Sequence, residues 1–470
     1  MPAKSLKELP VEVGVVYEGE RIRGPDMHIE LGGPKASFKF ELVQVKSKDE
    51  VTDGKITVLG KDIPDFEEGA VTPFGVLVEV YGKDIEKDLE GILERRIHDF
   101  INYIHGMMHL NQRYDIWCRI SKDAKNAGLK LEDIGSALIL LYKQEYSFID
   151  KIQITLITKE EEVKKFRENA LKVYESRDAR IRGMKDESVD VFYGCSLCQS
   201  FAPNHICIVS PERISLCGAL SWLDCRASAK IDPEGPNFPV EKGECLDETK
   251  GEFSGINKVI EEYSHGANEK IYMYSMFDYP HTSCGCFEAI AFYLPEVDGV
   301  GMVDRNFKDE AVNGMKFSTM AGQTGCGEQT VGFLGFGVLW MQSEKFLKAE
   351  GGWSRVVWMP SYLKEKAKDY IPKEIYDKIP TEKEIKNIGD LKNYLKEKNH
   401  PVVARWVAEE EKEEDKEEGE GKMPAIESAS VSGVPVMTSP TMAFPGGGGI
   451  KITLINAKIY AEKVIIKKVD

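Results

Sequence analysis

The sequence contains no run of apolar residues long enough to cross a bilayer. Its longest such run, Val331 to Met341, is far shorter than the roughly 20 residues that a transmembrane helix needs. The N-terminal segment also lacks the apolar centre of a signal peptide. We therefore expect a cytoplasmic protein without a membrane span.

An excess of positive charge is also missing. The 470 residues include 62 basic and 78 acidic side chains, which leaves a formal net charge of −16. Because nucleic-acid binding requires a basic face, the sequence argues against a nucleic-acid partner. An acidic run from Glu409 to Glu420 contributes much of this charge.

The chain is too long for a single hydrophobic core, and it shows no internal repeat. We predict an α+β fold with two mixed α/β domains, of which the second is loop-rich and binds metal, and a flexible C-terminal extension. The predicted parts are an α+β domain at 1–170, a catalytic metal-binding domain at 171–407, an acidic and then Ser/Pro/Gly-rich linker at 408–449, and a docking segment at 450–470.

The spacing of apolar residues predicts individual elements. Strands are predicted at Val11–Tyr17, Ser37–Val45, Gly75–Tyr81, Asp115–Ile120 and Ile152–Ile157. Helices are predicted at Ile85–Met108, Leu131–Tyr142, Thr158 to about Glu175, after Ser210-Pro211, and at Ile256–Tyr263, Glu288–Leu294, Tyr362–Tyr370 and Leu391–Lys398.

The chain has ten cysteines, and disulfides are rare in cytosolic proteins. Four of them form one dense segment: Cys195, Cys198, Cys207 and Cys217. Structural zinc is one interpretation, but zinc sites usually contain two short C-x2-C pairs and this segment contains one. Four thiolates on separate loops are more typical of an iron–sulfur cluster.

A second metal motif is the tripeptide Cys284-Gly285-Cys286. Its two thiolates and the backbone nitrogens of Gly285 and Cys286, if these lose their protons, can form a planar set of donors. Such a set suits nickel(II) or copper(II) better than zinc, although C-x-C also occurs by chance. If one cysteine of the first segment bridges to a metal held by this tripeptide, that metal keeps an open position for catalysis.

These residues resemble a known family. The segments YGCSLCQSFAPNHICIVSPERISLCGALSWLD and YPHTSCGCFEAIAFYLPE resemble the metal-binding segments of acetyl-CoA synthases. The resemblance extends from about residue 2 to residue 400 and includes the strings RDARIR, FSTMAGQTG and RVVWMP. Within this family, the chain is most similar to the beta subunits of archaeal acetyl-CoA decarbonylase/synthase complexes.

The resemblance implies an acyltransferase, a CO-methylating acetyl-CoA synthase. Such an enzyme reversibly assembles acetyl-CoA from carbon monoxide, a methyl group delivered by a methylated corrinoid protein, and coenzyme A. Its cofactor is a [4Fe–4S] cluster joined to a proximal and a distal nickel ion. The implied partners are carbon monoxide dehydrogenase subunits and a corrinoid iron–sulfur protein, within a large multi-subunit complex.

The resemblance also implies a role for each ligand. Cys198 bridges the cluster to the proximal nickel, and the other three cysteines of the first segment bind the cluster alone. The thiolates of Cys284 and Cys286 bridge the two nickel ions, and the nitrogens of Gly285 and Cys286 complete the distal site.

Further residues are candidates for roles near the metal centre or in coenzyme A binding. In the family's pattern, Phe201 lies over the open nickel face, although ordinary packing also explains it. Trp117 resembles a tryptophan linked to coenzyme A binding. Arg180 and Arg182 could meet the phosphates of coenzyme A or form a solvated helix end. For His205 we expect a local hydrogen bond rather than a ligand role.

The main competing interpretation is an iron–sulfur electron-transfer or scaffold subunit without nickel chemistry, in which C-G-C is incidental. A zinc-stabilised binding module is a third possibility. Four cysteines match no ligand position and are expected to be small buried side chains: Cys118, Cys225, Cys245 and Cys326.

Overall fold

The computed structural model describes residues 3–110, 113–200, 202–325 and 327–406. All of them belong to the first of two compact units, Met1–Lys412. The predicted linker and docking segment lie outside the described residues.

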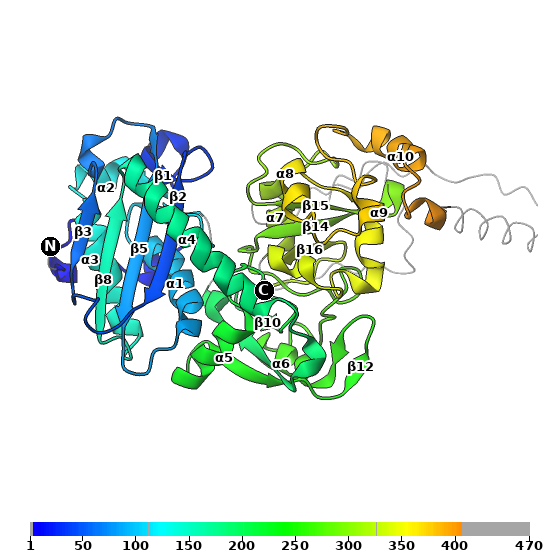
Figure 1. Ribbon diagram of the computed structural model, residues 1–470, viewed down its shortest axis with the longest axis horizontal. Coiled ribbons are helices and arrows are strands. Elements are labelled where there is room, and N and C mark those ends of the chain that lie inside the picture. Colours follow the sequence, from blue (N-terminus) through cyan, green and yellow to red (C-terminus); the bar gives the residue numbers. More distant parts are fainter. Residues whose placement is uncertain (1–2, 111–112, 201, 326, 407–470) are drawn as a thin grey trace, which may run out of the picture. The chain divides into compact units, whose positions relative to one another are not determined.

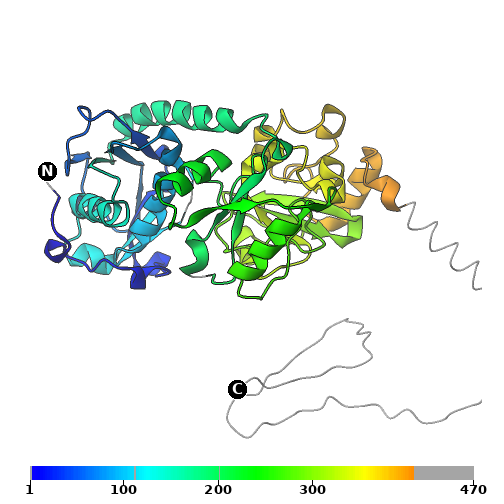
Figure 2. The same ribbon diagram turned by 90° about the horizontal axis from the view of Figure 1, so that it is seen from below.

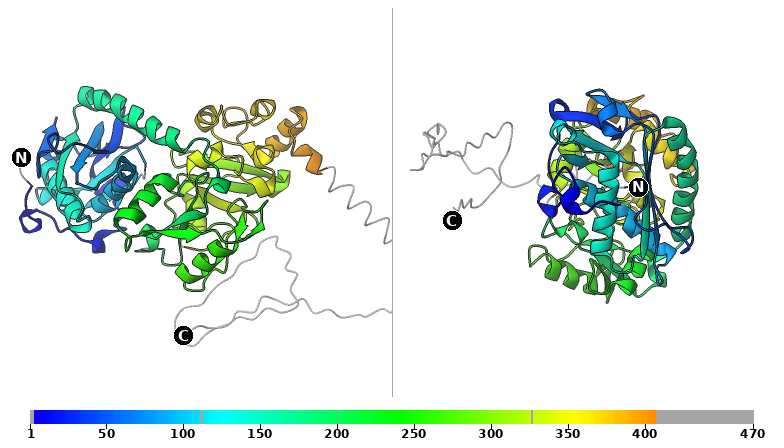
Figure 3. Two further views of the ribbon diagram at one scale, coloured as in Figure 1. Left: turned by 60° about the horizontal axis from the view of Figure 1, so that its bottom comes forward. Right: turned by 90° about the vertical axis from the view of Figure 1, so that its left-hand side faces the viewer.

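A mixed four-stranded sheet is the centre of the N-terminal part. Its strands, in order, are β2 (Lys39–Val45), β5 (Phe74–Tyr81), β8 (Lys151–Ile157) and β3 (Ile56–Leu59). Helices α1 (Glu90–Asn102) and α3 (Leu131–Glu145) pack against this sheet, and α4 (Glu160–Ile181) crosses its opposite face (Figure 1). Figures 2 and 3 show α4 alone on its side of the sheet. Because helices cover both faces, β5 is buried along nearly its whole length.

The N-terminal part contains a second four-stranded sheet. Its strands, in order, are β4 (Ala70–Thr72), β1 (Met27–Gly32), β7 (Trp117–Ser121) and β6 (Met107–His109). Helix α2 (Lys122–Asn126) follows β7, and the side chain of Ser121 caps it by accepting a hydrogen bond from the Ala124 nitrogen.

Two further sheets carry the cysteine segments. The first contains β10 (Cys207–Val209), β9 (Val191–Cys195) and β11 (Asn237–Glu241), beside a hairpin of β12 (Cys245–Asp247) and β13 (Glu252–Phe253). The other contains β16 (Phe333–Phe336), β14 (Ala289–Leu294), β15 (Gly299–Asp304) and β17 (Val356–Trp358). The remaining α-helices are α5 (Trp222–Ile231), α6 (Ser254–Tyr263), α7 (Phe317–Thr324), α8 (Ser361–Lys366), α9 (Lys373–Tyr376) and α10 (Ile388–Glu397).

The predicted α+β fold class is confirmed, and most predicted elements are present. The predicted helix Ile85–Met108 is too long, because α1 ends at Asn102 and Gly106 turns the chain into β6 at a φ of +78°. The predicted strand Val11–Tyr17 is wrong, since a 3-10 helix occupies Val15–Tyr17. The predicted domain boundary at residue 170 falls within α4 and stays a prediction.

Two wrong predictions concern the cysteine segments. The helix predicted at Glu288–Leu294 is instead a strand, Ala289–Leu294, that pairs with β15 on one side and β16 on the other. No helix follows Ser210-Pro211 in the described chain until α5. There the Ser210 hydroxyl accepts a hydrogen bond from the Arg213 nitrogen, and the chain turns toward Cys217.

None of the helices within the described ranges combines the length and apolar character that a bilayer crossing requires.

Candidate metal centre

Strands β9 and β10 place two cysteines side by side. Cys195 is the last residue of β9, Cys207 is the first of β10, and the antiparallel register pairs them directly. Side chains of directly opposite residues lie on the same face of a sheet. Both residues are buried, so their thiols meet inside the protein at one end of this sheet.

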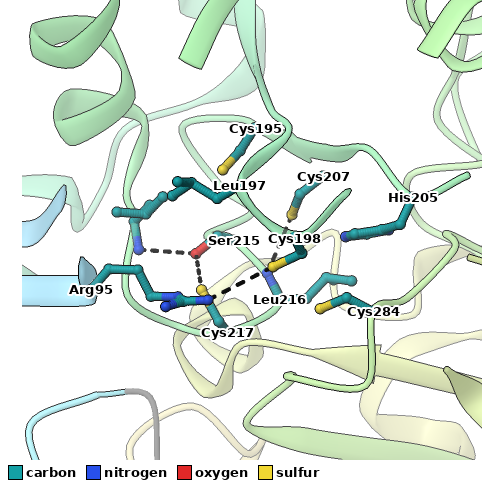
Figure 4. Close-up of a pocket in the computed structure, with 11 residues that line it drawn as sticks. Arg95, Cys195, Leu197, Cys198, His205, Cys207, Ser215, Leu216, Cys217 and Cys284 are labelled. Atoms are coloured by element: carbon teal, nitrogen blue, oxygen red, sulfur yellow. Dashed lines mark hydrogen bonds between the residues drawn. The ribbon is translucent and has the colours of Figure 1, made fainter. Parts of the chain in front are cut away.

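The other two cysteines of this segment come from turns at the same place. Cys198 lies in a short 3-10 helix, Leu197–Ser200. Cys217 lies in a tight turn, in which the Gly218 nitrogen donates to the Ser215 oxygen at 2.8 Å. Gly218 has a φ of +75°, and a β-carbon there would collide with the carboxylate of Glu288, so glycine is required. All four thiols line one cavity together with Cys284, as Figure 4 shows.

The Cys-Gly-Cys tripeptide is docked onto this turn by the backbone. The Glu288 nitrogen donates to the Leu216 oxygen at 3.0 Å, next to Cys217. The thiols of Cys198, Cys284 and Cys286 lie close enough to shift one another's acidity, and Cys198 and Cys284 line the same cavity. Two segments that are distant in the sequence therefore meet at Cys198, and the structure brings all six predicted cysteine ligands together.

The tripeptide has an unusual backbone conformation. Gly285 has a φ of +89°, and a β-carbon there would meet nothing within 4 Å. The backbone conformation is therefore one reason for glycine at this position. The Gly285 nitrogen donates to the Ser283 hydroxyl at 3.0 Å, and the Cys286 nitrogen donates to the Cys284 sulfur at 3.3 Å.

Burial and hydrogen bonding shift the acidity of these thiols in different directions. Burial raises the pKa of Cys195 to about 12 and the pKa of Cys207 well above its usual value. Hydrogen bonds from Cys198 and Cys284 hold the pKa of Cys286 well below its usual value. Because thiolate is the form that binds metal, the centre combines protonated sulfurs with one that ionises readily.

The donor set fits the predicted nickel–iron–sulfur group. Among the described residues, no three His, Cys, Asp or Glu side chains are arranged to hold a single metal ion. Five of the six thiols instead line one cavity, with Cys286 next to Cys284, and thiolates from several loops are the usual ligands of an iron–sulfur cluster. The adjacent thiols and amide nitrogens of the tripeptide are the donor types that suit nickel.

Of the other residues predicted near the centre, His205 is described by the structure. His205 lines the same cavity, and its Nδ1 lies 3.0 Å from the Thr282 hydroxyl, which is the expected local hydrogen bond. Burial lowers the pKa of His205 to about 4, so the ring is neutral at pH 7. Phe201 and Cys326 lie outside the described residues.

The two arginines predicted to contact coenzyme A lie at the end of α4. Arg180 forms an ion pair with Asp88, and Arg182 pairs with Glu175 at 2.6 Å. None of the hydrogen bonds, ion pairs or ring contacts of the described residues joins either arginine to Trp117.

Trp117 has a different cationic neighbour. The Lys308 ammonium lies 4.5 Å from the centroid of its ring, although the two residues are far apart in the sequence. The indole nitrogen of Trp117 is buried and has no hydrogen-bond partner among the described residues. No motif marks Lys308, so sequence reasoning did not find it.

Sequence reasoning also missed two arginines at the centre. The Arg95 Nη2, on α1, lies 3.8 Å from the Cys198 sulfur. The Arg305 Nη2 donates to the oxygens of Gly285 and Phe287, at 3.1 and 2.9 Å. Neither arginine lies near the cysteines in a recognisable spacing.

The cysteines without a predicted ligand role are of two kinds. Cys118 and Cys225 are fully buried, as expected, and the Asn237 amide donates to the Cys225 sulfur at 3.5 Å. Cys245 is exposed, so the expectation of burial is wrong for this residue. The chain runs there along the small hairpin β12–β13, which buries few side chains.

Two family models match this chain. A family model described as "CO dehydrogenase/acetyl-CoA synthase complex beta subunit" matches residues 9–163, and a model of the C-terminal part of the ACS/CODH beta subunit matches residues 174–406. The solved structure of the C-terminal domain of an acetyl-coenzyme A synthase alpha subunit is 38% identical, over 26% of this chain and 96% of that chain, with a TM-score of 0.24.

Three curated relatives are similar along nearly their whole length. The beta subunit of the acetyl-CoA decarbonylase/synthase complex of Methanothermobacter thermautotrophicus is 52% identical over 98% of this chain and 100% of that protein. The beta 2 subunit from Methanosarcina thermophila is 52% identical over 98% and 99%. The beta subunit from Methanopyrus kandleri is 51% identical over 99% and 98%. The chain therefore belongs to the family of acetyl-CoA decarbonylase/synthase complex beta subunits.

Proposed function

We propose that this chain is a CO-methylating acetyl-CoA synthase, an acyltransferase that reversibly assembles acetyl-CoA from carbon monoxide, a corrinoid-borne methyl group and coenzyme A. The observation that supports the proposal is the convergence of the tripeptide on the four-cysteine segment: Cys284 lines the same cavity as Cys198, and the Cys286 nitrogen lies 3.3 Å from the Cys284 sulfur. A protein that binds only an iron–sulfur cluster needs four cysteine ligands. It does not need the two further thiols of Cys284 and Cys286 beside Cys198.

The six thiolates would hold a [4Fe–4S] cluster and two nickel ions. Cys195, Cys207 and Cys217 would bind the cluster, Cys198 would join it to the proximal nickel, and the tripeptide would hold both nickel ions through its sulfurs and the nitrogens of Gly285 and Cys286. When bound, this group supplies electron-rich nickel for joining a methyl group to carbon monoxide and passing the acetyl group to coenzyme A.

The protein around the sulfurs would orient and tune them. The Leu216 nitrogen lies 3.5 Å from the Cys207 sulfur, and the Ser215 hydroxyl lies 3.3 Å from the Cys217 sulfur. Hydrogen bonds to cluster sulfurs fix the ligands and shift the reduction potential. Leu197 and Leu220 line the same cavity and keep its wall apolar, which limits the access of water.

The relatives are named as subunits of a complex, so we propose that this chain works in one as well. Its partners would be carbon monoxide dehydrogenase subunits and a corrinoid iron–sulfur protein. The acidic and Ser/Pro/Gly-rich sequence after Ala408 would tether the catalytic part and raise its local concentration near both partners. Deleting residues 409–470 tests the tether: a truncated chain that still co-purifies with its partners contradicts it.

The decisive experiment combines metal analysis with an exchange assay under anaerobic, reducing conditions. The synthase should contain about two nickel per four iron and should exchange acetyl groups between acetyl-CoA and labelled coenzyme A. An electron-transfer or scaffold protein would contain iron without nickel and would catalyse no exchange. A zinc-stabilised module would contain neither iron nor the brown colour of a cluster.

A further inference from the structure

Arg305 reaches from the end of β15 to the Cys-Gly-Cys tripeptide. One of its guanidinium nitrogens, Nη2, donates to the backbone oxygens of Gly285 and Phe287, at 3.1 and 2.9 Å. These two carbonyls lie on either side of Cys286. A single nitrogen therefore fixes the backbone before and after one of the proposed nickel ligands.

The position of Arg305 is set by rigid surroundings. Its backbone nitrogen donates to the Glu288 oxygen at 2.9 Å, which continues the pairing of β14 with β15 beyond the pair Ala289–Asp304. Its guanidinium carbon lies 5.5 Å from the ring centroid of Phe317, on α7. The backbone pairing with Glu288 and the contact with the Phe317 ring thus hold the guanidinium in place beside the tripeptide.

The contact with Gly285 has a chemical consequence. The Gly285 oxygen and the Cys286 nitrogen belong to the same peptide group, whose partial double bond shares charge between them. Under the proposed function, this nitrogen would bind the distal nickel as an amidate, and part of the negative charge would then reside on the Gly285 oxygen. Arginine carries a permanent positive charge, and hydrogen bonds from such a donor to a charged acceptor are strong.

We propose that Arg305 is a positioning residue for the distal nickel site. It holds the Cys-Gly-Cys backbone in its left-handed turn at Gly285 and offsets the charge of the Gly285–Cys286 peptide. The inference rests on the proposed function, because it requires nickel at the tripeptide. It predicts that Arg305 affects nickel binding through the tripeptide backbone and has no part in binding the iron cluster.

Arg355 provides a matched control. Its Nη1 also donates to a backbone oxygen, that of Glu350 at 3.3 Å, and its guanidinium carbon lies 5.6 Å from the ring centroid of Phe277. It contacts Asp298, just before β15 begins, whereas Arg305 lies just after β15 ends. Loss of Arg355 therefore removes a similar anchor from the same sheet without touching the tripeptide.

The test compares the full-length wild type with Arg305→Gln, Arg305→Lys and Arg355→Gln. Each protein is prepared anaerobically with its iron but without nickel, and nickel(II) affinity is measured by competition with a chelator. We expect unchanged iron content in all variants and a nickel affinity about 10- to 100-fold lower in Arg305→Gln, with partial recovery in Arg305→Lys. Arg355→Gln should bind nickel as the wild type does.

Two results would overturn this inference but leave the proposed function intact. One is a wild-type nickel affinity in Arg305→Gln, and the other is an equal loss of nickel affinity in Arg355→Gln. Thermal unfolding of the same samples separates a binding defect from misfolding, and Arg305→Lys supplies the answer if the Gln variant does not fold. If the wild type itself binds no nickel, the proposed function fails and this inference fails with it.

Discussion

The guanidinium Nη2 of Arg95 lies 3.8 Å from the sulfur of Cys198. Arg95 is 2% exposed, and its Nη1 forms a 2.8 Å ion pair with Asp99 one turn further along α1. A buried charge is stable only when it is paired, and Asp99 holds this one in a fixed direction. The N-terminal helix therefore supplies positive charge to the sulfur that we propose as the bridge between cluster and nickel.

Replacing Arg95 should make the cluster harder to reduce. In Arg95→Gln a positive charge near the proposed bridging sulfur is lost, so the reduced, more negative state is less well stabilised. We expect the reduction potential to fall by tens of millivolts, as measured by potentiometric titration of the cluster absorbance.

Arg96 serves as the control for this change. It also pairs with Asp99, and its other partner is Glu145 on α3 rather than a thiol. Arg96→Gln should lower the thermal unfolding midpoint and leave the potential unchanged. Equal shifts of potential in both variants would contradict a specific effect of Arg95.

The grouping of the cysteines could be predicted from the sequence because metal sites impose close, recognisable spacings, and five of the thiols line one cavity. The arginines could not, since Arg95 precedes Cys198 by 103 residues and reaches it only through the packing of α1. The helix wrongly predicted at Glu288–Leu294 has the same cause, because contacts with distant parts of the chain determine its structure. Its run of Ala, Ile, Phe, Tyr and Leu fits a buried helix or a buried strand equally well, and pairing with β15 and β16 decides between them.

Single cysteine substitutions should separate the two metals. Cys284→Ser removes a proposed nickel ligand that takes no part in the cluster, so nickel should be lost while the iron content stays near the wild-type value. Cys195→Ser removes a cluster ligand, and iron should be lost as well. Metal analysis of anaerobically purified protein measures both. Retention of nickel in Cys284→Ser would contradict the proposed role of the tripeptide.

Coenzyme A binding should depend on Lys308 more than on Arg180. Lys308 lies against the ring of Trp117, whereas Arg180 is already paired with Asp88. If Trp117 contacts coenzyme A, Lys308→Gln should raise the KM for coenzyme A several-fold with a smaller effect on kcat, because one charged contact with a phosphate is lost. Arg180→Gln is the control, and a larger effect there would favour the original assignment to the end of α4.

Acid should destabilise the protein partly through His400. The ring is buried, its Nε2 donates to the Val356 oxygen at 3.0 Å, and its Nδ1 accepts from the Val402 nitrogen at 3.1 Å. Burial lowers the pKa of His400 from 6.5 to about 4 in the folded protein. Between these values the unfolded chain binds the extra proton, so stability should fall as pH falls, by up to about 1.4 kcal/mol per pH unit.

The His400→Gln variant isolates this contribution from other groups that titrate in the same range. Glutamine can keep one of the two backbone hydrogen bonds, but it has no proton to gain at acidic pH. The wild type should therefore unfold at a higher temperature than His400→Gln at pH 7. The difference between their midpoints should shrink steadily from pH 6.5 to pH 4, because only the wild type is destabilised by protonating a ring whose Nδ1 already faces an N–H donor. A difference that stays constant over this range would show that His400 keeps an ordinary pKa in the folded chain.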